Sequence, residues 1–379
     1  MKNFRSTAAR LALNPDRGWP LIDRLASEPG LMEPTNFSGC RVCGSQNIRR
    51  AGIVEYYSGF AWPIYDCGDC HARFTLHDEA IYDAMHSEAG SVYNVYRALL
   101  DESTKAFRDR DVNALKQILS RASKYRFIID EVERGPRSVR LLEIGCSRGY
   151  LTSYFILAGY QVTGVDISKS AVESAREAFG DHFVVEGDPL IEAGAPYAVI
   201  YHVGTIGCVA DPLGLTRRLL RLLKPGGRLL FNSPNLESCW LADQLWIDAA
   251  PPPDLVSIFP PGFWMDHFAR EAQVEEHVEN CHQDKALAIG LSKLFGRHWQ
   301  RPVPIPLDQS SDRYMTGKVS GGMNGHRRIF REDAWQVFEK SVLKLGYKTR
   351  LSRLAPARPA EFGIFVKMTL RELTQAGTS

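Results

Sequence analysis

The chain lacks the features that mark membrane and secreted proteins. No window in its 379 residues approaches the roughly 20 consecutive apolar residues that a membrane-spanning helix needs. The apolar stretch over residues 8–13 is interrupted by Arg10 and followed by Asn14 and Pro15, which makes a poor signal peptide. We therefore expect a cytoplasmic protein that makes no membrane contact.

A large net excess of either charge is also absent. Lys plus Arg is 46 and Asp plus Glu is 44, a balance that creates no long-range field to gather nucleic acid or anionic lipid. The sequence contains no internal repeat and no low-complexity tract. Its apolar fraction of 44% is sufficient to build a folded core. Because the chain exceeds the usual size of one domain, we expect a core domain with accessory modules.

Four of the eight cysteines form two Cys-x-x-Cys pairs: Cys40 with Cys43, and Cys67 with Cys70. Two such knuckles supply four soft ligands, which suit a tetrahedral Zn²⁺ ion with no open coordination position. We therefore predict a structural zinc ribbon over residues 39–80, with a β-hairpin between the knuckles. His71 could compete as a ligand. The alternative, four reduced cysteines in a small core, is disfavoured by the low apolar content of this segment.

The rest of the chain falls into segments that differ in composition and in the spacing of apolar residues. Residues 1–38 contain four prolines and are expected to form an extended lead-in, whereas residues 81–136 have helical apolar spacing and are expected to form a helical linker. Residues 137–235 alternate apolar strands with amphipathic helices, which is the βαβ rhythm of a parallel sheet. We expect this core to resume over residues 326–373. The Pro-, Trp- and His-rich residues 236–325 are then an inserted substrate lid.

The first strand of that rhythm runs into a turn with Gly145 and Gly149, inside the sequence LLEIGCSRGY. Glycine there allows a tight turn and a close backbone approach to a ligand, and the N-terminus of the following helix suits a carboxylate. Asp166 ends the next strand about twenty residues on, where a carboxylate can accept the hydroxyls of a ribose. Asp188 ends the third strand, where it could bind an exocyclic amine such as that of adenine.

Two other nucleotide-binding patterns are missing. A phosphate-binding P-loop requires Gly-Lys-Ser/Thr after the turn, where this chain has Gly149 followed by Tyr and Leu. The strict Gly-x-Gly-x-x-Gly of a dinucleotide fold is absent, although Asp166 would serve the ribose of a dinucleotide equally well. The start Glu143-x-Gly145 favours an adenosyl amino acid. The alternative is that these glycines only terminate helices in a cofactor-free α/β domain.

The segments LLEIGCSRGYL, VTGVDIS, EGDP and LLKPGGRLLFNSPN resemble the successive motifs of class I S-adenosylmethionine-dependent methyltransferases. The resemblance implies an α/β fold with a Rossmann-like, mostly parallel seven-stranded sheet and helices on both faces. It also implies S-adenosylmethionine as the cofactor. It assigns seven residues to that cofactor: Glu143, Gly145, Cys146 and Gly149 around the methionyl part, Asp166 at the ribose, and Ile167 and Asp188 at the adenine.

The order of ribbon, helical segment and methyltransferase domain resembles the zinc-ribbon methyltransferases of bacterial sugar and natural-product pathways. The Ser-Pro-Asn ending of the last core motif is also similar to that of ubiquinone-type methyltransferases. One departure is clear, because such proteins often carry Glu-His shortly before Asp-Pro after the fourth strand. This chain has Gly-Cys-Val-Ala at residues 207–210 instead, so no acid, base or metal role of that pair is carried over.

Two histidines are the candidates for the chemical step, because an alcohol acceptor requires a base and histidine is the usual choice. His326 precedes RRIFRED, which resembles the His-Leu-x-x-Phe-Ser/Thr motif at the start of the family's last large helix, although the family's preceding Glu is Gly325 here. We expect His326 to be the base and His202, at the end of the fourth strand, to contact substrate or donor. Alternatively, His202 is a hydrogen-bonded strand-end residue and His326 a surface loop residue. Weaker candidates lie in the insertion: Asp254, His267 and His282.

The sequence as a whole predicts a methyltransferase that acts on an oxygen or carbon atom of a small molecule or sugar in a biosynthetic pathway. An alternative is an RNA base methyltransferase that grips RNA with the ribbon, although the mixed charge of the ribbon makes nucleic acid a poor partner. A second alternative is an inactive interaction scaffold. An adenosyl sulfonium can also donate its aminocarboxypropyl group, a choice that the donor motifs do not decide.

Overall fold

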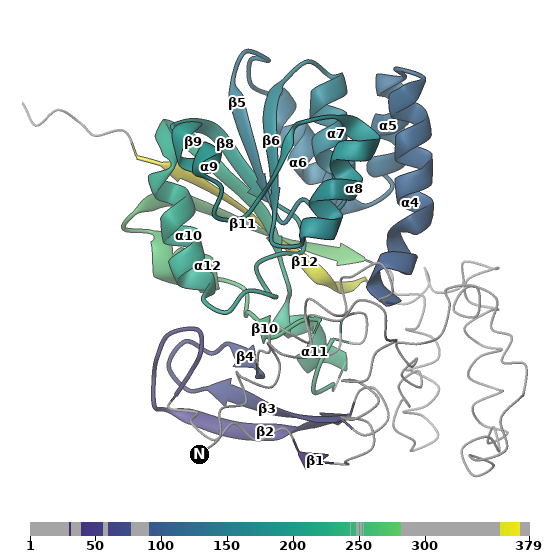
Figure 1. The fold of residues 1–379 in the computed structure, drawn as a ribbon. Helices are drawn as coiled ribbons and strands as arrows, with labels where there is room; N and C mark the ends of the chain where they lie inside the picture. The colour runs from purple at the N-terminus through teal and green to yellow at the C-terminus, as the bar shows by residue number, and fades with distance from the viewer. Residues whose placement is uncertain are drawn as a thin grey trace, which may run out of the picture.

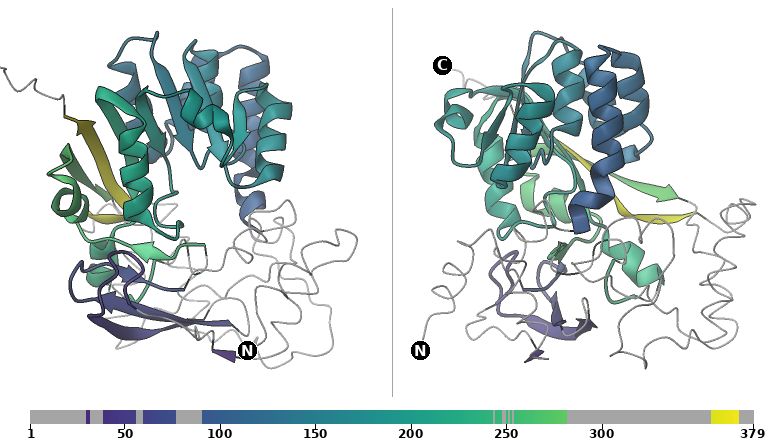
Figure 2. Two further views of the ribbon diagram at one scale, coloured as in Figure 1. Left: turned by 60° about the vertical axis from the view of Figure 1, so that its left-hand side comes forward. Right: turned by 45° about the vertical axis from the view of Figure 1, so that its right-hand side comes forward.

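The computed structural model describes residues 30–31, 39–55, 60–76, 91–242, 244–247, 250, 252, 254–281 and 357–371. Within these residues, a seven-stranded sheet carries helices on both faces, and a smaller β-module lies beyond one end of its strands (Figures 1 and 2). No helix among them is long and apolar enough to cross a membrane. Several predictions fall outside the described residues: those for His326, His282, most of residues 1–38 and residues 282–356.

The large sheet has the strand order β11-β12-β9-β8-β5-β6-β7. Its strands are β5 (Arg140–Ile144), β6 (Gln161–Asp166), β7 (Phe183–Val185), β8 (Tyr197–His202), β9 (Leu223–Ser233), β11 (Ala272–Cys281) and β12 (Arg358–Leu370). Neighbours from β7 to β9 pair in parallel, and β12 runs antiparallel to both β9 and β11. This confirms the predicted Rossmann-like, mostly parallel sheet. The strand order reverses between β5 and β8, and ligands bind at the carboxyl ends of such switch-point strands.

Part of the range predicted as a lid belongs to this sheet instead. Strand β11 lies within residues 236–325, and it pairs with β12 from Ala272 opposite Leu370 to Cys281 opposite Arg358. The strand is hard to recognise in the sequence AQVEEHVENC because it is an edge strand whose alternate side chains are exposed. Its preceding helix α12 (Phe263–Phe268) packs on the same sheet. The core domain therefore continues past the boundary placed at residue 235.

One face of the sheet is covered by α4 (Ser91–Arg108), α5 (Val112–Leu119), α6 (Ser123–Glu133) and α7 (Tyr150–Leu157). Leu115, Ile128 and Phe155 of these helices form one buried cluster with Leu141 of β5 and Tyr201 of β8. The segment predicted as a helical linker is therefore a layer of the core domain. Figure 2 shows these helices side by side along the sheet.

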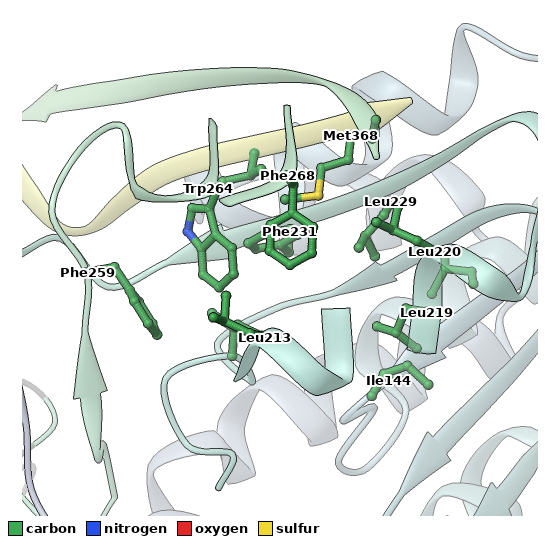
Figure 3. Close-up of a cluster of buried hydrophobic side chains, with 14 of the residues drawn as sticks. Ile144, Leu213, Leu219, Leu220, Leu229, Phe231, Phe259, Trp264, Phe268 and Met368 are labelled. Atoms are coloured by element: carbon green, nitrogen blue, oxygen red, sulfur yellow. The ribbon is translucent and has the colours of Figure 1, made fainter. Parts of the chain in front are cut away.

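The opposite face is covered by α10 (Pro212–Arg221) and α12. Figure 3 shows the apolar side chains that fill this interface: Ile144, Leu213, Leu219, Leu220, Leu229, Phe231, Phe259, Trp264, Phe268 and Met368. Consecutive strand residues such as Leu141 and Leu142 point to opposite faces, so β5 contributes a buried leucine to each layer. Both faces of the central strand are therefore closed to water.

The N-terminal module is built on a hairpin of β2 (Ile48–Glu55) and β3 (Phe60–Cys67), to which β4 (Arg73–Phe74) and β1 (Gly30–Leu31) add. Strand β4 also pairs with β10 (Ser257–Ile258), which follows the methyltransferase motifs in sequence. Phe74 of β4 belongs to the same buried cluster as the α10 and α12 face of the large sheet. The module therefore shares a hydrophobic core with the sheet domain.

Replacing Leu142 by Ala should lower the free energy of unfolding by about 2–5 kcal/mol, because the side chain is fully buried between the central strand and its helical cover. The matched change Met265→Ala removes a side chain that is 45% exposed, and should cost less than about 1 kcal/mol. Urea denaturation followed by circular dichroism measures both. Equal effects of the two variants would contradict this placement of the core.

Candidate functional site

The turn that links β5 to α7 bends at two glycines. Gly145 has φ +69° and Gly149, the N-cap of α7, has φ +79°, both in the left-handed region that residues with a Cβ atom disfavour. A Cβ atom on Gly145 would lie 2.9 Å from Cγ2 of Thr205 and closer still to its hydroxyl. A Cβ atom on Gly149 would lie 2.6 Å from the ring of Phe183. Both positions therefore require glycine for backbone conformation and for space.

Ser147 fastens this turn to the end of β6. Its backbone has φ +49°, and its N–H group donates a hydrogen bond of 2.7 Å to Oδ2 of Asp166. The other carboxylate oxygen of Asp166 accepts the N–H of Ser168 at 2.9 Å. A carboxylate is thus held beside the glycine turn by the backbone of both neighbouring elements. Sequence reasoning missed Ser147, and its place between two glycines is the signal that could have found it.

Glu143 lies on β5 with only 3% of its surface exposed. Its carboxylate accepts a hydrogen bond from the hydroxyl of Thr152 on α7. Burial raises the pKa of this carboxyl group to about 8, and the hydrogen bond from Thr152 opposes that rise. Glu143 therefore braces β5 against α7 behind the turn, and its contact with a cofactor stays a prediction.

The remaining residues predicted to contact the cofactor lie at the same edge of the sheet, because β5, β6 and β7 are parallel neighbours. Cys146 is buried, and burial raises the pKa of its thiol well above the ordinary value. Ile167 follows β6 and is 49% exposed, which leaves an apolar surface open beside Asp166. Asp188 caps α9 (Pro189–Ala193) with its carboxylate. The edge thus presents a carboxylate, an apolar surface and a second carboxylate in succession.

His202 occupies the end of β8, where the sequence places it, but its imidazole does not face an open crevice. The side chain is completely buried and stacks on Phe231 with ring centroids 4.6 Å apart. Trp264 of α12 packs edge-on against Phe231 and extends this aromatic cover. Burial lowers the pKa of His202 to about 3, and within the described residues neither ring nitrogen has a hydrogen-bond partner. The imidazole is therefore neutral and enclosed, and its contact with substrate stays a prediction.

The segment after β8, residues 203–211, packs against the glycine turn. The hydroxyl of Thr205 donates to the carbonyl of Ile144 at 3.3 Å, and its side chain fills the space that a Cβ atom on Gly145 would need. This contact brings the ends of β5 and β8 together at the switch point of the sheet. Sequence reasoning missed Thr205, since only its position directly after the fourth strand pointed to it.

The four knuckle cysteines converge in space. Their Sγ atoms all lie within 4.8 Å of one another, and the Cys40–Cys70 and Cys43–Cys67 pairs are each 3.7 Å apart. Four thiolates around a tetrahedral Zn²⁺ ion, with Zn–S bonds of about 2.3 Å, are about 3.8 Å apart. The backbone N–H groups of Val42 and Cys70 donate to Cys40 and Cys67 at 3.4 and 3.5 Å. The sulfur geometry therefore fits a tetrahedral metal ion.

Glu143→Gln should remove a pH dependence from the stability of the protein. Because folding raises the pKa of Glu143 from 4.5 to about 8, the folded state keeps a proton that the unfolded state releases between those values. This carboxyl group therefore lowers the free energy of unfolding by about 1.4 kcal/mol per pH unit over that window, with no further change above it. Denaturation at several pH values in that window should show that the free energy of unfolding falls less with rising pH in E143Q than in the wild type. Glu173 is exposed, so Glu173→Gln should follow the wild type. Parallel curves for all three proteins would refute the assignment.

Residues 106–278 match the family model of a methyltransferase domain. Among curated proteins, the ubiquinone biosynthesis O-methyltransferase of Ruegeria pomeroyi is 34% identical over 109 residues, which cover 27% of this chain and 44% of that protein. The enzyme of the same description from Vibrio cholerae is 33% identical over 107 residues, which cover 25% of this chain and 42% of that protein. The chain thus spans less than half the length of the curated relatives that it matches.

Solved structures show weaker similarity. The YcgJ protein of Bacillus subtilis has a TM-score of 0.36 and 16% identity, covering 65% of this chain and 97% of its own. A TehB-like methyltransferase from Corynebacterium glutamicum has a TM-score of 0.30 and 17% identity, covering 42% and 76%. Neither likeness is strong enough to bear on function. The order of motifs, the sheet topology and the family match agree that residues 106–278 form a methyltransferase domain.

Proposed function

We propose that the protein transfers a methyl group from S-adenosylmethionine to an oxygen or carbon atom of a small molecule or sugar in a biosynthetic pathway. The observation that carries this proposal is the left-handed turn from Gly145 to Gly149, tied to Asp166 at the switch point of the sheet. The similarity to proteins named as ubiquinone biosynthesis O-methyltransferases supports a small-molecule acceptor.

The residues at this edge fit the donor. The glycine turn and the N-terminus of α7 suit the methionyl carboxylate, since backbone N–H groups favour an anion there. A carboxylate offers about four acceptor positions, so the two backbone bonds of Asp166 are compatible with bonds from ribose hydroxyls. Exposed Ile167 would pack on the adenine ring and Asp188 would accept its amine. Glu143 would hold the turn from behind.

When bound, the donor supplies a methyl group activated by a sulfonium charge. Displacement at that carbon is in line, so the chain has mainly to align the acceptor and exclude water. For an alcohol acceptor we propose His326 as the general base, a residue outside the described part of the chain. His202 is the second candidate, as a substrate or donor contact. It would meet a ligand only if the aromatic cover at Phe231 moved.

The ribbon is proposed to be a structural module that holds one Zn²⁺ ion with Cys40, Cys43, Cys67 and Cys70. Four thiolates leave no coordination position for substrate. The ribbon's arginines support scaffolding over RNA binding, because Arg49 and Arg73 both pair with Asp66, at 3.3 and 2.7 Å. Methylation of RNA is the alternative result of the assay that follows. Incubation with labelled donor and pools of small molecules or RNA, followed by mass spectrometry, identifies which class gains methyl groups.

Gly145→Ala should weaken binding of S-adenosylhomocysteine at least about tenfold in calorimetry, or about 1.4 kcal/mol. Its Cβ atom would collide with Thr205 and force the turn out of shape. Gly159→Ala is the matched control, because Gly159 also has positive φ, at +85°, but faces open space. G159A should bind like the wild type. Absence of donor binding by the wild type would favour the inactive scaffold and refute the proposal.

Full-length protein should contain one Zn²⁺ ion per chain by elemental analysis, since four Sγ atoms form one group. Cys67→Ser should lose most of that metal and should expose the ribbon to proteolysis, because metal binding and folding of such a module are coupled. Cys281→Ser is the control, as this cysteine lies on β11 and is not a member of the group. Full zinc occupancy in C67S would contradict the assignment of the ligands.

A further inference from the structure

Arg41 lies between the two cysteines of the first knuckle, yet its side chain reaches out of the ribbon. Nη1 donates to the carbonyl of Thr75 at 3.1 Å. Nη2 donates to the carbonyls of Val209 and Ala210 at 3.5 and 3.2 Å. One partly buried guanidinium group therefore connects the knuckle to the segment that follows β8. Sequence reasoning missed this residue, because an arginine between knuckle cysteines carries no recognisable signal.

The same segment is held from a second side by residues that depend on the ribbon. The carbonyl of Gly207 accepts the N–H groups of Val256 and Ser257, both at 2.9 Å. Val256 in turn accepts the N–H of Thr75 at 3.0 Å, and Ser257 lies on β10, the partner of ribbon strand β4. The ribbon thus reaches the segment directly through Arg41 and indirectly through residues 256–257.

On its inner side the segment meets the glycine turn. Thr205 bonds to the carbonyl of Ile144 and fills the space beside Gly145. A hydrogen bond of 2.9 Å from the N–H of Cys208 to the carbonyl of Thr205 makes the intervening residues one compact turn. Only this short piece of backbone separates Thr205 from the carbonyls that Arg41 holds.

We infer that Arg41 is a positioning residue of the donor site: it holds residues 203–211 so that Thr205 is set against the Gly145 turn. This inference rests on the proposed function, in which that turn binds the adenosyl donor. It gives a role to residues 207–210, where similar methyltransferases often carry Glu-His. In this chain the carbonyls of Val209 and Ala210 in that stretch accept hydrogen bonds from the ribbon through Arg41. Donor affinity then depends on an intact first knuckle.

The chemistry of the guanidinium group explains why arginine occupies this position. Its planar fork presents several N–H donors in fixed directions, so one side chain can bond carbonyls of the ribbon and of the sheet domain together. A lysine would keep the charge as a single flexible ammonium group. Arg41→Lys should therefore retain only part of the effect, whereas Arg41→Ala should lose all of it.

The test uses full-length, zinc-loaded protein and calorimetric titration with S-adenosylhomocysteine. R41A should bind about tenfold more weakly than the wild type, and R41K should fall between them. Amide hydrogen exchange supplies a readout that does not involve the donor, because residues 203–211 should exchange faster in R41A. Zinc content measured for each variant ensures that metal loss is not the cause. If R41A does not fold, R41K carries both measurements.

Two other arginines of the ribbon are matched controls. Arg73 bonds Asp66 and the carbonyls of Gln244 and Leu245, so within the described residues its hydrogen bonds dock the ribbon at a place other than residues 203–211. The side chain of Arg49 is 82% exposed, and within the described residues it pairs with Asp66. Arg73→Ala and Arg49→Ala should change donor affinity less than about twofold and leave exchange of residues 203–211 as in the wild type.

The outcomes separate the inference from the proposed function. If R41A binds S-adenosylhomocysteine as tightly as the wild type, or if R41A and R73A lose affinity equally, the role assigned to Arg41 is wrong. Neither result affects the proposal that the protein binds the methyl donor. A wild-type protein that binds no adenosyl ligand overturns the proposed function and with it the effect on affinity. Exchange of residues 203–211 then still decides whether Arg41 holds that segment.

Discussion

The hydrogen bond from the Ser147 amide to Asp166 is the contact on which the arrangement of the site depends. It ties the glycine turn after β5 to the last residue of β6, beyond the backbone pairing of these two parallel strands. Gly145 and Ser147 are both left-handed: the N–H of Cys146 still bonds the carbonyl of Val165 on β6, and the next N–H, that of Ser147, bonds the side chain of Asp166. Glu143 and Thr152 support the turn from behind, and Thr205 supports it in front.

The ribbon is integrated with the sheet domain at three levels. Apolar side chains such as Val42 and Phe74 share a buried cluster with the α10 and α12 face. Strand β4 pairs with β10, and arginines 41 and 73 bond carbonyls across the junction. Through Arg41 the ribbon bonds the segment that follows β8 at the switch point of the sheet. The module that we propose to hold zinc therefore lies next to the edge where we propose that the donor binds.

The aromatic cluster at the end of β8 encloses the side chain of His202. His202 stacks on Phe231 and Trp264 packs edge-on against Phe231, and within the described residues the ring nitrogens of His202 and Trp264 are buried without a hydrogen-bond partner. Burying an imidazole without a hydrogen-bond partner is unfavourable, and the neutral form lowers that cost. The enclosure follows from α12, which the sequence places inside a lid and the structure places on the sheet.

Local patterns in the sequence by themselves determined the strand and helix rhythm of residues 137–235, the glycine turn, and the pairing of the knuckle cysteines. Each of these depends on residues close together in the chain, where backbone conformation and ligand spacing act directly. Only the tertiary structure decided that β11 completes the sheet, that His202 is enclosed, and that Arg41 reaches Val209, which lies 168 positions away. Such contacts are set by how the layers pack, and no short stretch of sequence contains that information.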